Sequence, residues 1–434
     1  MVTAANASVH PASLWAATAQ PAPALPRLEG SLDADVAVIG AGFSGLSTAL
    51  HLRERGADVA VLEAVDVGFG ASGRNNGQVI PTLTRPDPDD MVARLGTEAG
   101  ERFVALVRDS AARLFDLVRR HEIACEAEQT GWIQPAHSPG RLRLSEKRHR
   151  QWSRRGAPVE LLDRAAVARM LGSEVYFGGF WNPTGGHINP LALARGLAAR
   201  VVSLGGRVFV GSPATAIERR PGGWRIASDS GEVRARAVVV ATNAYTEHVI
   251  DRIRRTMVPV LSWQMASAPI GAKVAATIVP GRQAVSDTHG DLRFFRWTRD
   301  GRLVTGGGLV VRLDAANRLP RIVGARLSKI FPQLGVPRFD HVWNGRLAMT
   351  RDYFPHVHEL GPDAWTWIGC NGRGVALGVA LGRELAGVVT GGDRRDLALP
   401  LAPVRPIRLH PLASLAAPLA LIGRRIKDRR EFGG

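Results

Sequence analysis

Three glycines at a fixed spacing are the first residues whose arrangement suggests a specific chemistry. Gly40, Gly42 and Gly45 form the motif G-A-G-F-S-G directly after the apolar run DVAVI. This spacing allows a tight turn and lets backbone N–H groups approach a pyrophosphate at a helix N-terminus. Glu63 ends the next apolar run, where its carboxylate can accept hydrogen bonds from both ribose hydroxyls of an adenosine and would repel a 2′-phosphate. The pattern predicts a dinucleotide site, argues against NADP, and has a glycine turn without ligand as its alternative.

Two further glycine loops bear on which dinucleotide binds. Residues 68–83 (GFGASGRNNGQVIPTL) form a long loop where an NAD dehydrogenase usually begins another helix, and the small residues 71–73 permit close approach of phosphate or ring oxygens. Residues 365–389 hold a third glycine loop followed by a helix that we expect to begin near Gly374. The positive end of that helix would stabilise the anionic edge of a reduced flavin. The loops together favour FAD.

Four side chains are candidates for contact with a substrate. Arg74 lies in the second glycine loop, where it either binds a carboxylate bidentately or pairs with a phosphate or a structural acid. His187 either points into the site or caps the helix that follows. Tyr245 and Trp343 either form aromatic walls of an amine pocket or are packing residues. Since no Ser/His/Asp or Cys/His nucleophile pattern is present, we expect groups that position a substrate rather than a nucleophile.

These residues require a sheet with helices around it. The apolar runs 35–39 and 58–63, with helical spacing between them, predict a β-α-β unit. A helix is predicted over 88–121, and 141–155 is a polar basic stretch. Short alternating runs over 205–245 then predict a β-meander that leads into a buried strand. The pattern indicates an α/β fold whose doubly wound domain is interrupted by a second domain.

Composition restricts the class of protein. The chain has 434 residues, of which 45% are hydrophobic and 22% charged, and its formal net charge is +17. These values exclude a disordered or fibrous chain, and the charge alone does not select nucleic acid, anionic lipid or acidic metabolites as a partner. Cys125 and Cys370 stand far apart and outside any CxxC pattern, so neither a disulfide framework nor a metal site is expected. Without a signal peptide or a long apolar segment, we expect a cytoplasmic protein.

Several motifs together carry a resemblance to a known family. They are SLWAATA (13–19), VIGAGFSGLSTALHLRERGADVAVLE (38–63), GASGRNNGQV (70–79), GGHINPLALARGLA (185–198), VVVATNAY (238–245), WNGRLAMTRDYFPHV (343–357) and GCNGRGVAL (369–377). As a set, they resemble the D-amino-acid-oxidase superfamily of FAD-dependent oxidoreductases, in particular its branch of γ-glutamylputrescine oxidase-like enzymes. The resemblance extends over nearly the whole chain.

The resemblance implies a domain division and a set of cofactor contacts. It implies a Rossmann-like FAD-binding domain interleaved with a substrate domain whose mixed or antiparallel sheet covers the flavin. We divide the chain into an N-terminal arm (1–30), an FAD-binding domain (31–80, 186–250 and 341–400), a substrate domain (81–185 and 251–340) and a basic amphipathic tail (401–434). The implied cofactor contacts are Gly40, Gly42, Phe43, Ser44, Gly45, Glu63, Ala71, Ser72, Gly73, Gln78, Val208, Ala241, Gly345, Gly372, Arg373, Gly374, Val375 and Ala376.

The chain departs from its relatives in two respects. Some relatives carry a cysteine that attaches the flavin shortly before a T-x-D motif, but residues 340–350 contain none, so we expect noncovalent FAD. Oxidases of the sarcosine-oxidase kind place a lysine near the flavin to assist dioxygen, and residues 294–308 contain none. Either Arg293, Arg296 or Arg302 replaces that cation, or the electrons go to an acceptor other than dioxygen.

The resemblance implies the oxidation of a C–N bond in a small amine or amino acid. Hydride transfer to the flavin would give an imine that water hydrolyses, and a γ-glutamylputrescine-like amine, a polyamine or an N-substituted amino acid fits as substrate. The alternatives are an enzyme that acts on an amine of modified tRNA and a flavin-binding protein without amine turnover. Nucleic acid is not the expected partner, since no RNA-binding module accompanies the charge. The basic tail is either a solvated face or a helix that docks on an anionic membrane or on a partner protein.

Overall fold

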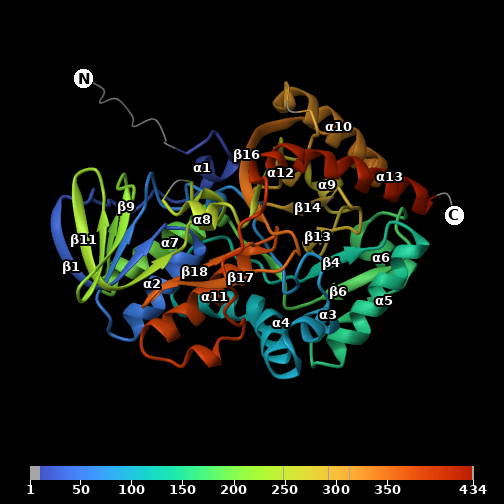
Figure 1. Ribbon diagram of the computed structural model, residues 1–434. Helices are drawn as coiled ribbons and strands as arrows, with labels where there is room; N and C mark the ends of the chain where they lie inside the picture. The colour runs from blue at the N-terminus through green and yellow to red at the C-terminus, as the bar shows by residue number, and fades with distance from the viewer. Residues whose placement is uncertain (1–9, 248, 292, 312, 433–434) are drawn as a thin grey trace, which may run out of the picture.

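The computed structural model describes residues 10–432 except residues 248, 292 and 312. In this part of the chain two eight-stranded sheets lie beside one another, and helices pack against both (Figure 1). A separate two-stranded ribbon is formed by β3 (Gln78–Val79) and β7 (Gly186–His187). The observed architecture confirms the predicted α/β fold class.

The first sheet has the strand order β17–β18–β11–β1–β2–β8, and β9 and β10 extend it through an antiparallel meander onto β11. The five strands from β18 to β8 are parallel to one another, whereas β17 is antiparallel to β18. The strands are β1 (Gly30–Ile39), β2 (Val59–Leu62), β8 (Arg207–Phe209), β9 (Ala216–Arg220), β10 (Gly223–Ala227), β11 (Gly231–Val240), β17 (His356–Gly361) and β18 (Ala364–Ile368).

Alternation along β1 explains why this sheet is covered on both faces. Val36 and Val38 pack into the core beneath the helices, whereas Ala37 and Ile39 face the core on the opposite side, where β10 contributes Ile226. The helix α2 packs between α7 and α11, and α4 packs against α11. These four helices are α2 (Phe43–Glu54), α4 (Thr97–Arg120), α7 (Pro190–Ser203) and α11 (Gly374–Val389).

The second sheet has the order β16–β12–β15–β14–β13–β4–β6–β5, and its pairs are antiparallel except for β13 with β4. On β14, Phe295 packs in the core beneath α10, whereas its neighbour Phe294 faces the first sheet. The strands are β4 (Trp132–Pro135), β5 (Glu160–Leu162), β6 (Gly179–Asn182), β12 (Val258–Ser267), β13 (Ala284–Ser286), β14 (Phe294–Trp297), β15 (Leu303–Gly307) and β16 (Phe339–Met349). The helices around this sheet are α5 (Pro139–Ser153), α6 (Arg164–Leu171), α9 (Ala272–Ala275) and α10 (Ala315–Ile330). The helix α3 (Pro88–Leu95) packs on α4 and α5, and α8 (Asp251–Arg254) contributes Ile253 to the core that contains Val36 and Val38.

Several segments differ from their predicted form. The basic stretch 141–155 lies largely within α5, a helix capped by Ser138. The N-terminal arm contains α1 (Leu14–Thr18), whose Trp15 is fully buried, so its described part is docked. The tail contains α12 (His410–Ala416) and α13 (Ala420–Phe432). The strand β16 belongs to the second sheet, although our boundary at residue 341 assigned it to the FAD-binding domain; the other boundaries stay predictions. Within the described residues, no helix is both long and apolar enough to cross a membrane.

Candidate active site

A cavity of about 640 Å³ separates the two sheets. One wall consists of the loops at the carboxyl ends of β1, β2, β8 and β11, and the opposite wall comes from β12, β13, β14 and β16 of the second sheet. Ligands of doubly wound sheets bind at the carboxyl ends of the strands, because the loops there are free to vary. The position of the cavity therefore agrees with a cofactor site.

The first glycine loop leaves the N-terminus of α2 open toward this cavity. Gly42 is the N-cap and offers no side chain to the free N–H groups of the helix. A Cβ on Gly42 would lie 2.8 Å from Oγ of Ser72, whose hydroxyl accepts a hydrogen bond from the Phe43 N–H at 3.0 Å. A Cβ on Gly45 would lie 2.0 Å from the carbonyl oxygen of Gly40. The glycines thus allow close packing of strand, helix and second loop around the space for a pyrophosphate.

The Glu63 carboxylate is held at the end of β2 by two backbone donors. The Ala41 N–H donates to Oε2 at 2.8 Å, and the Val65 N–H donates to Oε1 at 3.1 Å. Burial raises the pKa of Glu63, while these two N–H groups oppose the rise because they stabilise the ionised form. Each oxygen retains a further lone pair for a ribose hydroxyl.

The third glycine loop brings a second helix N-terminus to the cavity. The helix α11 begins at Gly374, with Arg373 as its N-cap, and Gly372 has a φ of +83°. A Cβ on Gly374 would lie 2.9 Å from Cβ of Cys370, so the loop is packed too tightly for a side chain there. Two open helix ends at one cavity suit a cofactor with two anionic parts, a pyrophosphate and a reduced flavin ring.

Most of the predicted cofactor residues line this cavity, and four do not. Gly45 and Gly73 lie behind the wall, where each packs against a backbone carbonyl, and Val208 and Ala376 are buried in the core on the helix side of the first sheet. Val208 points away because alternation along β8 directs its side chain to that core. The predicted residues on the wall are Gly40, Gly42, Phe43, Ser44, Glu63, Ala71, Ser72, Gln78, Ala241, Gly345, Gly372, Arg373, Gly374 and Val375.

A comparison with protein families identifies the family of the chain. The family model described as FAD dependent oxidoreductase matches residues 35–388. The chain belongs to this family. As an FAD-dependent oxidoreductase it is an enzyme with FAD as its cofactor, and the open helix ends, the glycine cradle and the anchored Glu63 fit that group.

Individual relatives support the assignment. A gamma-glutamylputrescine oxidoreductase of Escherichia coli (strain K12) is 33% identical over 389 residues, which cover 89% of this chain and 90% of the relative. A tRNA 5-methylaminomethyl-2-thiouridine biosynthesis bifunctional protein MnmC of Shewanella amazonensis is 29% identical over 226 residues, which cover 51% of this chain and 31% of that protein. The solved structure of glycine oxidase from Geobacillus kaustophilus has a TM-score of 0.72 at 20% identity, covering 87% of this chain and 99% of its own, and shows the same fold.

Of the four predicted substrate contacts in this oxidoreductase, Arg74 and Tyr245 lie on the cavity wall. Arg74 is half-buried, its Nε donates to the Phe69 carbonyl at 2.6 Å, and its guanidinium lies 4.4 Å from the centre of the Phe69 ring. The hydroxyl oxygen of Tyr245 accepts the Arg346 N–H at 3.1 Å. A carboxylate-binding role of Arg74 stays a prediction.

His187 and Trp343 lie off the cavity wall. His187 is buried in the β3–β7 ribbon, where a ring nitrogen, Nε2, lies 3.0 Å from the Arg282 carbonyl oxygen, and burial lowers its pKa well below the ordinary value. His187 does not cap α7, because Asn189 is the cap. It does not point into the cavity either, since it is not among the residues of the wall. Trp343 is also buried, and its Nε1 donates to the Arg74 carbonyl at 2.8 Å. Its observed contacts are therefore those of a packing residue.

Three distant side chains hold consecutive carbonyls of the second glycine loop. Trp343 donates from Nε1 to the Arg74 carbonyl, and Trp15 donates from Nε1 to the Asn75 carbonyl at 2.7 Å. Arg296 donates from Nε to the Asn76 carbonyl at 2.6 Å. Arg296 also donates to the carbonyls of Ile188 and Trp297, and it lies 4.7 Å from the centre of the Trp15 ring. These contacts assign Arg296 to loop support rather than to a cation for dioxygen.

The other two proposed cations also have structural partners. Arg293 lies 3.3 Å from Asp291, and Arg302 forms ion pairs with Asp300 at 2.8 Å and Asp340 at 2.7 Å. Neither lies on the cavity wall. Among the described residues that line the cavity there is no lysine or histidine, so its cations are Arg74, Arg346 and Arg373.

Arg373 differs from the other two arginines because its guanidinium makes no hydrogen bond or ion pair with any described part of the chain. Its Nε is buried, and the guanidinium lies 5.1 Å from the centre of the Trp132 ring on β4 of the second sheet. Burial lowers its pKa to about 9. Gln78 is complementary: its Nε2 donates to the carbonyls of Val285 at 2.8 Å and Phe295 at 3.3 Å, while its Oε1 is buried without a described partner.

The sequence did not point to several wall residues. Pro213, Ala214 and Thr215 follow β8, and the signal that would have found them is their place after a strand parallel to β2. From the second sheet, Ser286 and Phe294 face each other across β13 and β14 and line the cavity together. The alternation of side chains along these strands predicts that each strand has two faces, but it does not predict which face lies toward the first sheet.

Proposed function

We propose that this FAD-dependent oxidoreductase oxidises a C–N bond of a small amine or amino acid that carries a carboxylate. The observation that carries the proposal is that one cavity holds two polar groups without a hydrogen-bond partner in the described part of the chain, the guanidinium of Arg373 and the amide oxygen of Gln78. Buried polar groups are normally satisfied, and leaving one unpaired costs about 1 to 3 kcal/mol. A carboxylate complements the guanidinium, and an amine N–H complements the amide oxygen.

The charges on the wall support the same choice. The acids among the wall residues are Glu63 and Glu247. Glu63 already accepts two backbone N–H groups, and Glu247 is exposed and lies 3.7 Å from Arg346. Together with the arginines, this arrangement disfavours a free polyamine with its several positive charges and favours a zwitterion. Both γ-glutamylputrescine, named for the Escherichia coli relative, and an N-substituted amino acid carry a carboxylate and an amine.

The residues of the chain have positioning roles in this proposal. Bound FAD would supply the acceptor for a hydride from the amine-bearing carbon. With loss of the N–H proton to solvent the substrate becomes an imine, which water hydrolyses to a carbonyl compound and ammonia or, from a secondary amine, an amine. The Gln78 amide oxygen orients the neutral amine through an N–H hydrogen bond, and Arg373 holds the carboxylate. The apolar side chains of Ile80, Phe294 and Leu347 limit the access of water to the cavity.

The cofactor attachment and the electron acceptor are also proposals. No cysteine occurs over 340–350, where some relatives attach the flavin, which supports noncovalent FAD. Cys370 lies on the wall with its Sγ 3.9 Å from the Ala348 carbonyl oxygen. The lysine associated with dioxygen in some relatives is absent from the described cavity wall. The electron acceptor is therefore either dioxygen, with another group in place of the lysine, or a different acceptor.

A visible absorption spectrum of the purified holoenzyme tests the function. The spectrum is recorded without oxygen before and after addition of a pool of amines and amino acids with and without carboxylates. We expect the oxidised-flavin band to bleach with carboxylate-bearing amines and to persist with putrescine. Release of the flavin on acid precipitation checks that it is noncovalent. A flavin band that no amine bleaches refutes the proposal and leaves modified tRNA and flavin binding without turnover as the alternatives.

A further inference from the structure

The C-terminal tail forms one helical run that contacts the body of the protein through several polar and charged side chains. It comprises α12, a 3-10 turn at Ala417–Leu419 and α13, and it runs across the second sheet near α10 (Figure 1). His410 contacts the Met257 carbonyl oxygen from Nε2 at 2.8 Å, and Arg425 donates from Nη2 to the Gly308 carbonyl at 3.0 Å. A surface helix usually buries its apolar face, whereas the hydrogen bonds of this tail to the protein come from polar and charged side chains.

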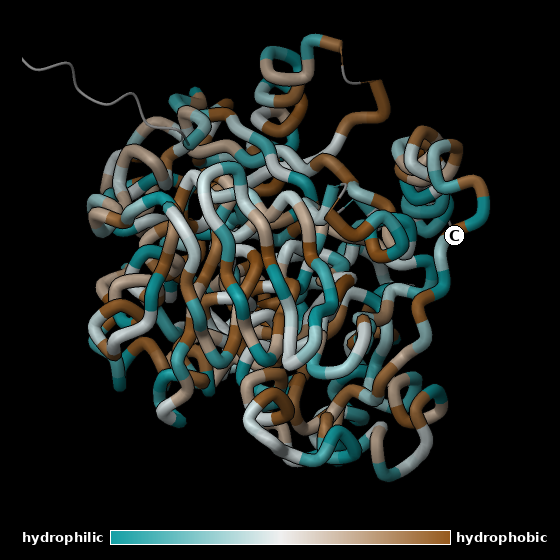
Figure 2. Tube along the Cα trace, turned by 60° about the vertical axis from the view of Figure 1, so that its left-hand side comes forward, coloured by the Kyte–Doolittle hydropathy of each residue, from teal (hydrophilic) through white to brown (hydrophobic). Residues whose placement is uncertain are grey.

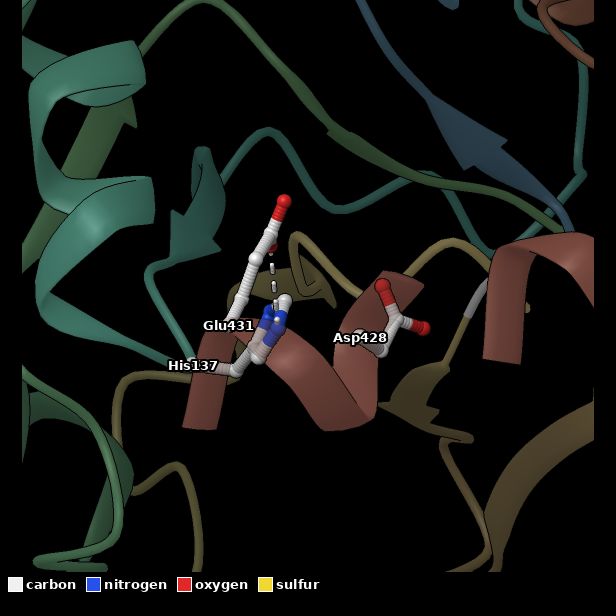
Figure 3. A group of neighbouring side chains, drawn as sticks. All are labelled: His137, Asp428 and Glu431. Atoms are coloured by element: carbon white, nitrogen blue, oxygen red, sulfur yellow. Dashed lines mark ion pairs between the residues drawn. The ribbon is translucent and has the colours of Figure 1, made fainter. Parts of the chain in front are cut away.

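Both acids of the tail face the body of the protein. The Asp428 carboxylate accepts the Gly290 N–H at 2.9 Å and 3.1 Å, and the Glu431 carboxylate accepts Nε of Arg141 at 2.6 Å. Figure 3 shows these two acids on α13 beside His137, whose Nε2 lies 4.0 Å from Glu431. The three side chains have the composition of a metal site, but Arg141 already neutralises Glu431, and we interpret the group as the contact that docks the tail.

The outward face of the same run carries a row of exposed aliphatic side chains, which we name the apolar stripe. Their spacing of three and four residues in alternation places them along one side of a helix. In Figure 2 the helix beside the mark of the C-terminus shows hydrophobic and hydrophilic segments together. The members are Leu412 (59% exposed), Leu415 (78%), Leu419 (57%), Ile422 (44%) and Ile426 (45%).

Positive charge accompanies the apolar stripe. Residues 401–434 contain seven Lys or Arg and two acids, and both acids are the inward-facing ones described above. Arg408 lies exposed just before the stripe, and Lys427 (69% exposed) and Arg430 lie exposed near its end. The outer side of the tail therefore combines aliphatic side chains with basic groups.

We propose that the apolar stripe and its basic residues dock this enzyme on an anionic lipid surface. A helix that lies in the membrane interface buries its aliphatic side chains among acyl chains, while Lys and Arg contact anionic headgroups. A second copy of the chain would bring the same basic residues against one another, which disfavours a dimer across the stripe. The contacts of Arg425, Asp428 and Glu431 with the protein fix the orientation in which the stripe is presented.

Flotation of the full-length holoenzyme with vesicles tests the proposal. We expect binding to vesicles of phosphatidylcholine and phosphatidylglycerol in equal parts, weak binding to phosphatidylcholine alone, and release by salt. The double variant Leu415→Glu and Leu419→Glu should bind the anionic vesicles at least about tenfold more weakly, because it places two negative charges in the apolar stripe. The variant should still fold, since both side chains lie outside the core. The matched control, Leu161→Glu and Val202→Glu, places the same charges at partly exposed aliphatic residues away from the tail.

Two outcomes overturn the proposal. The first is equal flotation of the wild-type enzyme and the stripe variant, or of anionic and neutral vesicles. The second is a lipid-free dimer that the stripe variant converts to a monomer in analytical ultracentrifugation, which would make a second copy the occupant. Flavin content and the circular dichroism spectrum of each variant show that its fold is intact, so a lost interaction is not mistaken for unfolding.

Discussion

Replacement of Arg373 by methionine has two opposed consequences that a merely structural arginine would not produce. Methionine retains an apolar side chain that can pack on the Trp132 ring, and it removes the charge and the hydrogen-bond donors. In the free enzyme the guanidinium has no hydrogen-bond or ion-pair partner in the described chain, and burial lowers its pKa to about 9, well below the ordinary value. The charged form is therefore less stable in the folded protein than in the unfolded chain.

The sign of the stability effect follows from this pKa. Below about pH 9 the group is charged in both states, so the whole cost of burying it opposes folding; above about pH 9 that cost diminishes as the folded form loses its proton. At about 1.4 kcal/mol per pKa unit the cost is at most roughly 5 kcal/mol, and contact with solvent in the cavity reduces it. We expect Arg373→Met to raise the free energy of unfolding at pH 7 by ~1 to 2 kcal/mol in the absence of substrate.

The effect on substrate binding has the opposite sign. A hydrogen bond to a charged group contributes about 1.5 to 3 kcal/mol. Loss of the carboxylate contact should therefore raise the Kd of a carboxylate-bearing substrate roughly 10- to 150-fold, while an amine without a carboxylate is affected little. The positively charged Arg373→Lys variant should recover part of the affinity, since lysine supplies a point charge without the bidentate fork.

Anaerobic stopped-flow measurement of flavin reduction separates Kd from the limiting rate, and urea unfolding measures the stability change. The matched control is Arg220→Met, which removes one charge from an exposed residue of the β9–β10 hairpin that pairs with Glu218. If Arg373→Met leaves Kd unchanged, the carboxylate role is refuted while the amine chemistry stands. If it loses FAD and stability together, Arg373 is a cofactor contact, as the resemblance implied.

Three further substitutions test the site. Glu63→Gln should bind FAD more weakly. In the wild type, FAD retention, measured by flavin fluorescence, should fall on acidification at a higher pH than an ordinary carboxyl would give, because burial raises the pKa of Glu63. An identical pH profile in the variant would refute this role. His187→Gln should keep kcat within about twofold and lower the free energy of unfolding by ~1 kcal/mol, and a large loss of kcat at normal stability would restore a catalytic role. Trp15→Phe removes the donor to the Asn75 carbonyl and should weaken FAD binding, with unchanged binding as the contrary result.

The predicted residues that the structure places together on the cavity wall were encoded in nearby positions of the chain. Gly40, Gly42 and Glu63 act through the backbone of one β-α-β unit, so their spacing alone brings them to the same edge of the sheet. The same holds for Gly374, since a glycine loop before an apolar helical pattern locates a helix N-terminus. Such motifs depend on local geometry, which the tertiary fold does not override.

The errors concern residues whose surroundings come from distant segments. His187 is polar and precedes a helix, which made a cap or a site role reasonable, but Asn189 caps the helix and β3 buries His187. Val208 was placed at the cofactor by resemblance, but the pleat of β8 turns it to the core. In each case the outcome depends on which face meets a neighbour, and a single strand or turn does not encode that.

The second glycine loop shows how the distant segments are nevertheless specified. The carbonyls of Arg74, Asn75 and Asn76 would be costly to bury without donors, since a loop has no ladder to satisfy them. Trp343, Trp15 and Arg296 supply the donors, and they come from β16, the N-terminal arm and β14. The conformation of this loop therefore depends on both sheets and on the arm, whereas Gly40, Gly42 and Glu63 with its two backbone donors all lie within residues 36–65.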